Sequence, residues 1–269
     1  MCRVLRVHRS GFYAWLAMPK SARRAADDKL MDVIATIFED SNKTYGSPRV
    51  WRELVKKDIH VGRKRVERLM REQGLRAIQV YKKPRYEAGR PATTADNVLE
   101  QDFNSPKPDR VWVTDITYIR TLEGWLYLCA VIDICSRRAV GWSMGRRQDH
   151  ELVLGALKMA VGRRRPGKGL VIHSDQGTQF GAEEVQEYIR SHGFIQSMSR
   201  RGNCYDNALM ESFFSTLKKE VVRGFIYSTH SEAKLDLVDY IEGFYNRERN
   251  HTSLGGISPV EFELMYFGI

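Results

Sequence analysis

The order of apolar runs between residues 110 and 198 constrains the fold of this 269-residue sequence more than any other feature. Three runs rich in β-branched and aromatic residues follow one another across short turns, which is typical of an antiparallel meander. Helix-like and strand-like patterns then alternate. The expected strands are residues 111–119, 125–134, 138–145, 170–174 and 194–198, and the expected helices are residues 149–161 and 179–192. This order predicts a mixed α/β fold.

Two aspartates lie on the expected strands. Asp115 shares one strand face with Val113, because side chains alternate between the two faces of a strand. A carboxylate on a largely apolar face is costly unless it is paired or holds a metal. Asp175 ends the apolar run 170–174, at the carboxyl end of a strand, where open α/β sheets tend to place ligands. Asp175 could instead only shape the turn before Gly177.

A third acid, Glu211, lies in a helical pattern. The apolar stripe of this expected helix consists of Met210, Phe213, Phe214, Leu217 and Val221. Glu211 is rotated about 100° from the stripe, and Ser215 and Lys218 share its face. Lys218 is therefore placed to meet a phosphate near the acids. Glu211 could instead only stabilise the helix dipole.

Three convergent carboxylates suit a magnesium site. Magnesium takes oxygen ligands and is usually held by one or two carboxylates together with substrate phosphate oxygens. Two such ions about 3.5–4 Å apart activate the attacking oxygen and stabilise the leaving oxygen in a displacement at phosphorus. A zinc site would instead require Cys or His ligands. The hypothesis is that Asp115, Asp175 and Glu211 form one metal-binding triad.

Several sequence segments carry a resemblance to a known family. They are residues 112–119, 130–133 with Gly141-Trp142, 173–180, 197–208 through Glu211 to Leu217-Lys218, Tyr245-Asn246 and Ser258-Pro259. Together they resemble the catalytic core of the DDE transposases and retroviral integrases. The chain is most similar to the second-frame (orfB) product of bacterial insertion sequences that are encoded in two overlapping frames. The resemblance covers nearly the whole chain, and the acid motifs do not depart from the family pattern.

The resemblance implies both a fold and a reaction. The expected fold is a ribonuclease-H-like (integrase core) mixed sheet with flanking helices, preceded by a small all-α helix-turn-helix-like domain. Asp115, Asp175 and Glu211 are expected to be the catalytic, metal-binding acids, and Lys218 the basic residue that follows the glutamate. The implied activity is cleavage and strand transfer of insertion-sequence ends with Mg²⁺ or Mn²⁺, as two ions. The implied partners are terminal-repeat and target DNA, the first-frame protein and further copies of the chain.

Two other functions remain open from the sequence. A DNA-binding regulator of transposition would keep the fold without catalysis, although the intact acids and Lys218 argue against it. A hydrolytic nuclease would cleave without strand transfer, and the same metals serve water and a 3′-hydroxyl alike.

Positive charge is concentrated in the first third of the chain. Residues 1–90 contain 22 Lys/Arg and 10 Asp/Glu, a net charge of +12, whereas residues 91–269 contain 21 and 23, a net charge of −2. Such an uneven distribution is expected if the first third binds a polyanion. We therefore divide the chain into a DNA-binding region at 1–77, a basic, proline-containing linker at 78–109 and a catalytic core at 110–269.

The first region has a helix-turn-helix-like pattern. Helices are expected over 27–40, from Ser47-Pro48 onward with Ser47 as N-cap and Val55 facing inward, and over 63–73, ending at Gly74. The third of these is the expected DNA reader. The residues predicted to contact DNA are Arg63, Lys64, Arg65, Arg68 and Arg71 on its outer face, Lys82 and Lys83 in the linker, and Lys218 in the core.

The other chemically interesting residues are expected to be structural. Asp133 ends a strand, but it stands outside the family's triad, and Asp206 is expected to cap the Glu211 helix. Residues 202–205 are a candidate loop over the site. His173 and His251 could each contact substrate, but a structural role is expected for both.

The remaining patterns place limits on the protein. The four cysteines, at positions 2, 129, 135 and 204, show no metal-site or disulfide spacing. The sequence contains no 18-residue apolar run and does not open with a secretory signal, so a cytoplasmic protein without membrane contact is expected. Residues 231–249 predict a last amphipathic helix, with Leu235 on its apolar face.

Overall fold

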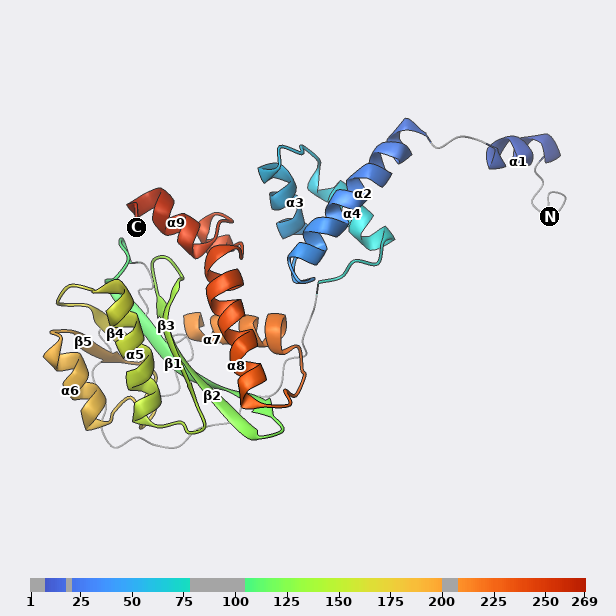
Figure 1. Cartoon of the computed structure of the whole chain (residues 1–269). Coiled ribbons are helices and arrows are strands. Elements are labelled where there is room, and N and C mark those ends of the chain that lie inside the picture. The colour runs from blue at the N-terminus through green and yellow to red at the C-terminus, as the bar shows by residue number, and fades with distance from the viewer. Residues whose placement is uncertain (1–7, 18–20, 78–104, 200–207) are drawn as a thin grey trace. The chain divides into compact units, whose positions relative to one another are not determined.

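The computed structural model describes residues 8–17, 21–77, 105–199 and 208–269 (Figure 1). The contacts between Cα atoms divide the chain into two compact units, residues 1–77 and 78–269. Lys82, Lys83, Asp206 and the loop 202–205, which carried sequence predictions, lie outside the described residues.

The first unit is helical. Its elements are α1 (Arg9–Leu16), α2 (Ala22–Asp40), α3 (Ser47–Lys56) and α4 (Arg63–Glu72). Helices α2, α3 and α4 pack through buried residues such as Ile34, Leu54 and Leu69, each at most 1% exposed. Gly74 follows α4 with φ 69°, a left-handed conformation that suits glycine at a helix end, as predicted.

Two details of α3 differ from the prediction. Gly46, not Ser47, is the N-cap, and Pro48 therefore stands one position further into the first turn. Val55 is 42% exposed, because the helix ends at Lys56 and only Val50 and Leu54 reach the core. Inward placement of Val55 was wrong.

The second unit is built on the predicted mixed sheet, with strand order β3-β2-β1-β4-β5. Its strands are β1 (Val111–Thr121), β2 (Gly124–Asp133), β3 (Ala139–Gly145), β4 (Val171–Ser174) and β5 (Ile195–Met198). The first three form the expected antiparallel meander, and β4 and β5 run parallel to β1. The helices α5 (His150–Arg164) and α6 (Glu183–Ser191) connect β3, β4 and β5.

Helices cover both faces of this sheet. Helices α5 and α6 bury one apolar cluster together with Trp112, Cys129 and Ile172 of the strands. On α5, Ala156 lies so close to Gly141 that a Cβ atom there would meet the Ala156 carbonyl oxygen at 2.4 Å. Position 141 therefore admits only glycine without a shift of the helix.

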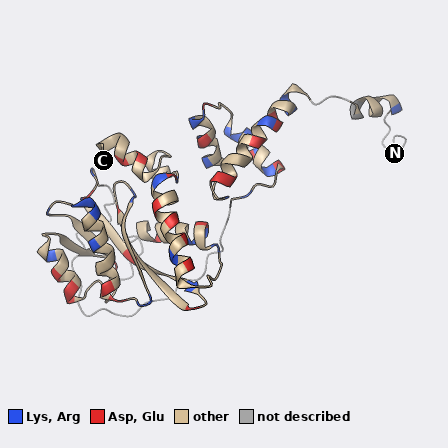
Figure 2. Ribbon diagram, viewed as in Figure 1, with Lys and Arg blue, Asp and Glu red and all other residues tan. Residues whose placement is uncertain are grey.

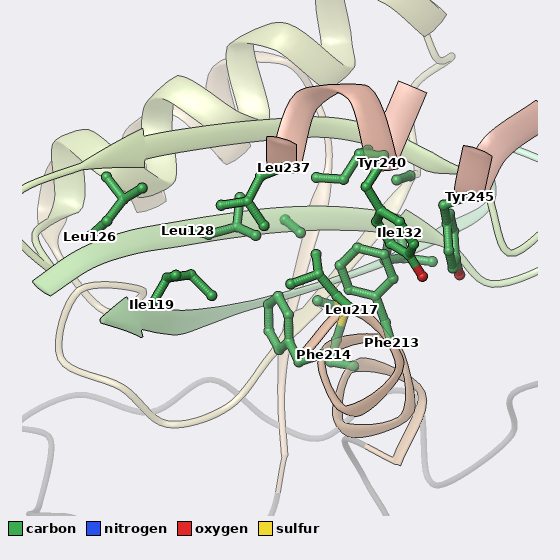
Figure 3. Close-up of a cluster of buried hydrophobic side chains, with 14 of the residues drawn as sticks. Ile119, Leu126, Leu128, Ile132, Phe213, Phe214, Leu217, Leu237, Tyr240 and Tyr245 are labelled. Atoms are coloured by element: carbon green, nitrogen blue, oxygen red, sulfur yellow. The ribbon is translucent and has the colours of Figure 1, made fainter. Parts of the chain in front are cut away.

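The opposite face is covered by α7 (Ala208–Leu217), α8 (His230–Val238) and the π-helical segment η3 (Asp239–Tyr245). Figure 3 shows Phe213, Phe214 and Leu217 of α7 close to Leu237 of α8. All four lie against side chains of strands β1 and β2. The buried stripe predicted for the Glu211 helix is confirmed for Met210, Phe213, Phe214 and Leu217. A second π-helical segment, η2 (Lys218–Val222), continues α7 and leaves Val221 only partly buried.

The C-terminal region departs from the single predicted helix over 231–249. It forms α8 and η3, and Leu235 is 73% exposed, so its predicted apolar role was wrong. A short 3₁₀ turn, η4 (Thr252–Leu254), and a further helix, α9 (Pro259–Phe267), follow. Ser258 and Glu261 form a capping box at the start of α9. That signal was present in the sequence and predicts the helix.

Helix α9 is fixed to the sheet by a buried acid. Glu263 is fully buried and accepts hydrogen bonds from Arg138 and from Arg164 at 2.9 and 3.0 Å. Arg164 also pairs with Asp109, whose backbone N–H donates to Asp133 at 2.7 Å. In the described ranges, no helix is long and apolar enough to cross a membrane.

Candidate active site

Asp115 and Asp175 come together because β1 and β4 are parallel neighbours. In the register, Thr114 pairs with Ser174, so each aspartate lies one residue beyond this pair, in the same direction along the sheet. Val113 and His173, two residues before the respective aspartates, are also paired. Alternation along the strands then directs both carboxylates to the face covered by α7. The sheet thus brings two of the three predicted acids to one edge.

Both carboxylates are half-buried and held locally. Asp115 accepts a hydrogen bond from the N–H of Ile116 at 2.7 Å, and Asp175 accepts one from the N–H of Gly177 at 3.0 Å. Burial raises the pKa of Asp175, and the Gly177 hydrogen bond acts in the opposite direction. Asp175 therefore shapes the turn before Gly177, as its structural alternative proposed, while its other oxygen remains available for a ligand.

The buried thiol of Cys129 responds to both acids. Burial raises its pKa to about 12, and the charges of Asp115 and Asp175 add to the increase. The hydroxyl oxygen of Thr114 lies 3.4 Å from the sulfur, and this contact lowers that pKa. One group on β2 therefore lies in the electrostatic field of both carboxylates.

Lys218 lies near Asp115 at the junction of α7 and η2. Its ammonium nitrogen is 4.6 Å from the ring centroid of Tyr118, three residues after Asp115 on β1. Burial lowers the pKa of Lys218, and the charge of Asp115 opposes this shift. The tyrosine ring is 55% exposed and meets Trp125 edge-on at 5.0 Å. The sequence did not identify this aromatic contact, since nothing in the spacing pairs residues 118 and 218.

Glu211 is exposed in the first turn of α7. Within the described ranges, no three Asp, Glu, His or Cys side chains are grouped closely enough to hold a metal ion. The structure therefore assembles Asp115, Asp175 and Lys218 but does not bring Glu211 to the two aspartates as a third ligand. The oxygen donors that are assembled fit a hard divalent cation such as magnesium and do not fit zinc.

Two residues beside the site are structural, as predicted. Asp133 is fully buried and accepts hydrogen bonds from the backbone N–H groups of Ser136 and Asp109. Burial raises its pKa, and these hydrogen bonds oppose the change. His173 is fully buried, and its Nδ1 lies 2.9 Å from the hydroxyl oxygen of Ser197 on β5.

The sequence did not predict the ion pair between Glu220 and Arg249. Arg249 donates to both oxygens of Glu220, at 2.8 and 2.9 Å, and the hydroxyl of Tyr240 donates to the same carboxylate at 2.7 Å. The side chains of Glu220 and Arg249 are 10% and 8% exposed. Glu220 follows Lys218 by two residues, so the pair fixes the segment that carries the candidate basic residue. No sequence pattern links positions 220 and 249.

The candidate DNA-reading helix is only partly as predicted. Arg63 and Lys64 are exposed at the start of α4, and Arg71 pairs loosely with Glu67 on the same helix at 3.3 Å. Arg65 and Arg68 instead turn back to α2.

Their partner there is Asp27, which accepts hydrogen bonds from Arg65 at 2.7 Å and from Arg68 at 2.6 Å. These hydrogen bonds lower the pKa of Asp27. Figure 2 shows acidic as well as basic positions on these helices. We expected all five cations of α4 to point into solvent. For Arg65 and Arg68 this was wrong, because both donate hydrogen bonds to Asp27 on α2.

The fold and the acids define a class of protein. The integrase core domain family matches residues 105–204 and, through a second description of that domain, residues 211–267. An HTH-like domain family matches residues 25–83. The fold is thus confirmed as a ribonuclease-H-like integrase core preceded by an HTH-like helical region. These domains imply DNA binding and dependence on a divalent metal.

Relatives of nearly full length narrow the class. The chain is 41% identical over 267 residues to the insertion element IS600 uncharacterized 31 kDa protein of Shigella sonnei, covering 99% of this chain and 98% of the relative. It is 41% identical over 268 residues to transposase InsF for insertion sequence IS3A of Escherichia coli, covering 98% and 92%. The chain therefore belongs to the IS3 family of DDE transposases, which are of the polynucleotidyl-transferase type.

Solved structures show a more distant likeness. The HTLV-2 integrase catalytic core domain in complex with magnesium is 16% identical, with a TM-score of 0.46, and the match covers 59% of this chain and 99% of that one.

Proposed function

We propose that the chain cleaves the ends of its insertion sequence and joins them to a second DNA at one site formed by Asp115, Asp175 and Glu211. The observation that carries this proposal is the pair of aspartates on β1 and after β4, whose charges act together on one buried thiol. Their half-buried oxygens are the donors that Mg²⁺ prefers. We assign the site two Mg²⁺ ions, with Mn²⁺ as the other cation that accepts the same ligands.

The reaction is two displacements at phosphorus. In the first, a water oxygen bonds to phosphorus, the bond to the 3′-oxygen breaks, and the leaving oxygen takes a proton and becomes the 3′-hydroxyl. In the second, that hydroxyl oxygen attacks a target phosphodiester, and a new 3′-hydroxyl leaves. The bound ions supply activation of the attacking oxygen and charge stabilisation of the leaving one.

The protein side chains position the DNA for this chemistry. Asp115 and Asp175 hold the cations, and Glu211 completes the ligand set from α7 when DNA and metal are bound. Lys218, whose ammonium already lies near Asp115, contacts a phosphate oxygen beside the reacting group. Positioning and charge stabilisation account for most of the rate, as in other phosphoryl transfers.

The helical region holds the terminal repeat. Arg63 and Lys64 are the exposed cations at the start of α4 that we assign to DNA contacts, and Arg71 is a third. Lys82 and Lys83, in the proposed linker at 78–109 between a DNA-binding region at 1–77 and a core at 110–269, are also assigned to DNA contacts. Arg65 and Arg68 contribute less, because Asp27 offsets their charge.

The active assembly contains more than one chain. Two element ends must be held together for joining, so we assign a homo-oligomer on DNA. The first-frame protein of the element is the second proposed partner, and it would add a further DNA-binding helical domain.

A strand-transfer assay tests the proposal. It uses the chain fused to its first-frame protein, labelled end DNA and Mg²⁺, with Glu211→Gln and, as matched control, Glu187→Gln at an exposed acid of α6. Joined products from wild type and the control, but not from Glu211→Gln, are expected. Cleavage without joining by wild type would identify a nuclease, and DNA binding with neither product would identify a regulator.

A further inference from the structure

A polar cavity of about 250 Å³ lies beside α7, apart from the candidate metal ligands. Its lining includes Tyr245 and the apolar Leu209 and Phe213, together with the polar residues Arg137, Ser212, Thr216, Arg249, His251 and Ser253. These polar residues come from the β2–β3 turn, from α7 and from the segment after η3. The space is far larger than the roughly 15 Å³ that one water molecule needs, so it has room for a small polar group.

Arg137 is one of the two arginines that line this cavity. Its backbone has a left-handed φ of 62°, and its carbonyl accepts a hydrogen bond from the Tyr245 hydroxyl at 3.1 Å, so the turn is held in place. Burial lowers the pKa of Arg137. In the part of the chain that the structure describes, its guanidinium makes no ion pair or hydrogen bond. The charge of Asp133 acts on this guanidinium and opposes the pKa shift. Asp133 makes no hydrogen bond to it, so an anion that does would offset the cost of burying the group.

The second cation of the cavity is already neutralised. Both oxygens of Glu220 accept hydrogen bonds from Arg249, so that pair adds polar structure but no net charge. The hydroxyls of Ser212, Thr216 and Ser253 are further donors, and no acid is among the lining residues. One guanidinium with several hydroxyls is the donor set that proteins present to a phosphate of the DNA backbone.

The position of the cavity separates it from the reacting phosphate. Ser212 follows Glu211, and one step along a helix turns the side chain by about 100°. Thr216 lies one turn further along the same side as Ser212, whereas Ser215 and Lys218 lie on the side of Glu211. The cavity therefore opens on a different flank of α7 from the one that carries the acid and the lysine.

We propose that this cavity binds one non-reacting phosphate of the DNA backbone and so fixes the DNA against α7. The proposal rests on the proposed function in requiring DNA as the substrate. The ligand is a phosphodiester in a continuous strand, and free inorganic phosphate shares its chemistry without the strand.

The test is a double-mutant cycle between protein and DNA. End DNA carries a neutral methylphosphonate at one position at a time, and binding is measured with the full-length Asp115→Asn chain, so that the DNA is not cut. At one position the substitution is expected to weaken binding about tenfold, and with Arg137→Gln added that sensitivity should disappear. Arg137→Gln should also reduce the slope of the logarithm of the DNA-binding constant against the logarithm of the salt concentration, by about 0.9 in magnitude.

Controls separate this contact from general effects. Arg190→Gln removes an exposed charge on α6 and is expected to leave the sensitivity at that position intact. If Arg137→Gln melts early, Thr216→Val, which keeps the shape and removes one donor, should still reduce the coupling. Competition by millimolar inorganic phosphate at constant ionic strength, with no position-specific coupling, would mean that the cavity takes the free ion and would overturn the proposal. Equal effects of methylphosphonate on wild type and Arg137→Gln at every position would overturn it as well.

The outcomes also distinguish this proposal from the proposed function. If Asp115→Asn shows position-specific coupling but wild type neither cleaves nor joins DNA in the strand-transfer assay, the cavity is supported and the proposed enzyme activity is refuted. Strand transfer by wild type without any coupling would do the reverse.

Discussion

The buried pair of Glu220 and Arg249 provides the sharpest stability prediction. The Glu220 side chain is 10% exposed, and replacing Arg249 by Met removes the cation that pairs with it while the Tyr240 hydroxyl still donates to it. Removal of one partner of a buried ion pair costs about 3–5 kcal/mol, because the remaining charge is no longer compensated. The double variant Glu220→Leu/Arg249→Met removes both charges and is expected to recover most of that loss. Arg249→Met should therefore be far less stable than the double variant.

The control is an exposed pair in the same unit. Arg163 and Glu242 lie 2.5 Å apart, but their side chains are 43% and 34% exposed, so Arg163→Met should cost at most about 1 kcal/mol. Urea unfolding followed by tryptophan fluorescence measures each loss, with the transition of the catalytic unit fitted separately from that of the helical unit. A cost for Arg249→Met no larger than that for Arg163→Met would refute the reasoning. A double variant as unstable as Arg249→Met would refute it equally.

Three other predictions follow from the structure. Arg63→Glu with Lys64→Glu should abolish specific end binding in a gel shift at moderate salt without changing thermal stability, because both side chains are exposed; unchanged binding would exclude α4 as the DNA reader. Cys129 is buried and Cys135 is half-buried, and burial raises their pKa values to about 12 and about 11. Because only the thiolate reacts, both should resist iodoacetamide at pH 8.5 in the native chain and react after unfolding, as peptide mass mapping will show. Rapid labelling of both in the native chain would contradict the raised pKa values. Asp115→Asn, or chelation of divalent ions, should lower nicking on the order of 10³-fold and leave end binding intact, and a variant that still cuts would refute the metal site.

The sequence pattern predicted correctly the features that are decided within a single strand or helix. The strand alternation that put Asp115 on one face with Val113 appears in the sheet, and the buried stripe of α7 follows the predicted spacing from Met210 to Leu217. Each of these is settled within one element, by which side chains an amphipathic strand or helix must bury.

The wrong expectations concern partners that lie far away in the chain. The sequence places Arg65 and Arg68 on a basic surface, but in the fold they contact Asp27, which lies about 40 residues earlier in the chain. Leu235 has the spacing of a core residue, but the helix turns it to solvent. The membership of Glu211 in the triad stays a prediction, because its position relative to the two aspartates depends on contacts that no helical period contains.

Two charged residues in the segment that follows α7 point in different directions. Lys218 and Glu220 are two residues apart at the start of η2, and a step of two residues along a helix turns a side chain to roughly the opposite side. Lys218 accordingly lies near Asp115 and the Tyr118 ring, while Glu220 lies against Arg249 and Tyr240. The buried pair thus holds the segment from behind without using the charge of Lys218, which stays near the aspartates. An anchored helix that offers a desolvated ammonium is suited to a phosphate that arrives with its own negative charge, since the free energy of that contact is not spent on ordering the lysine.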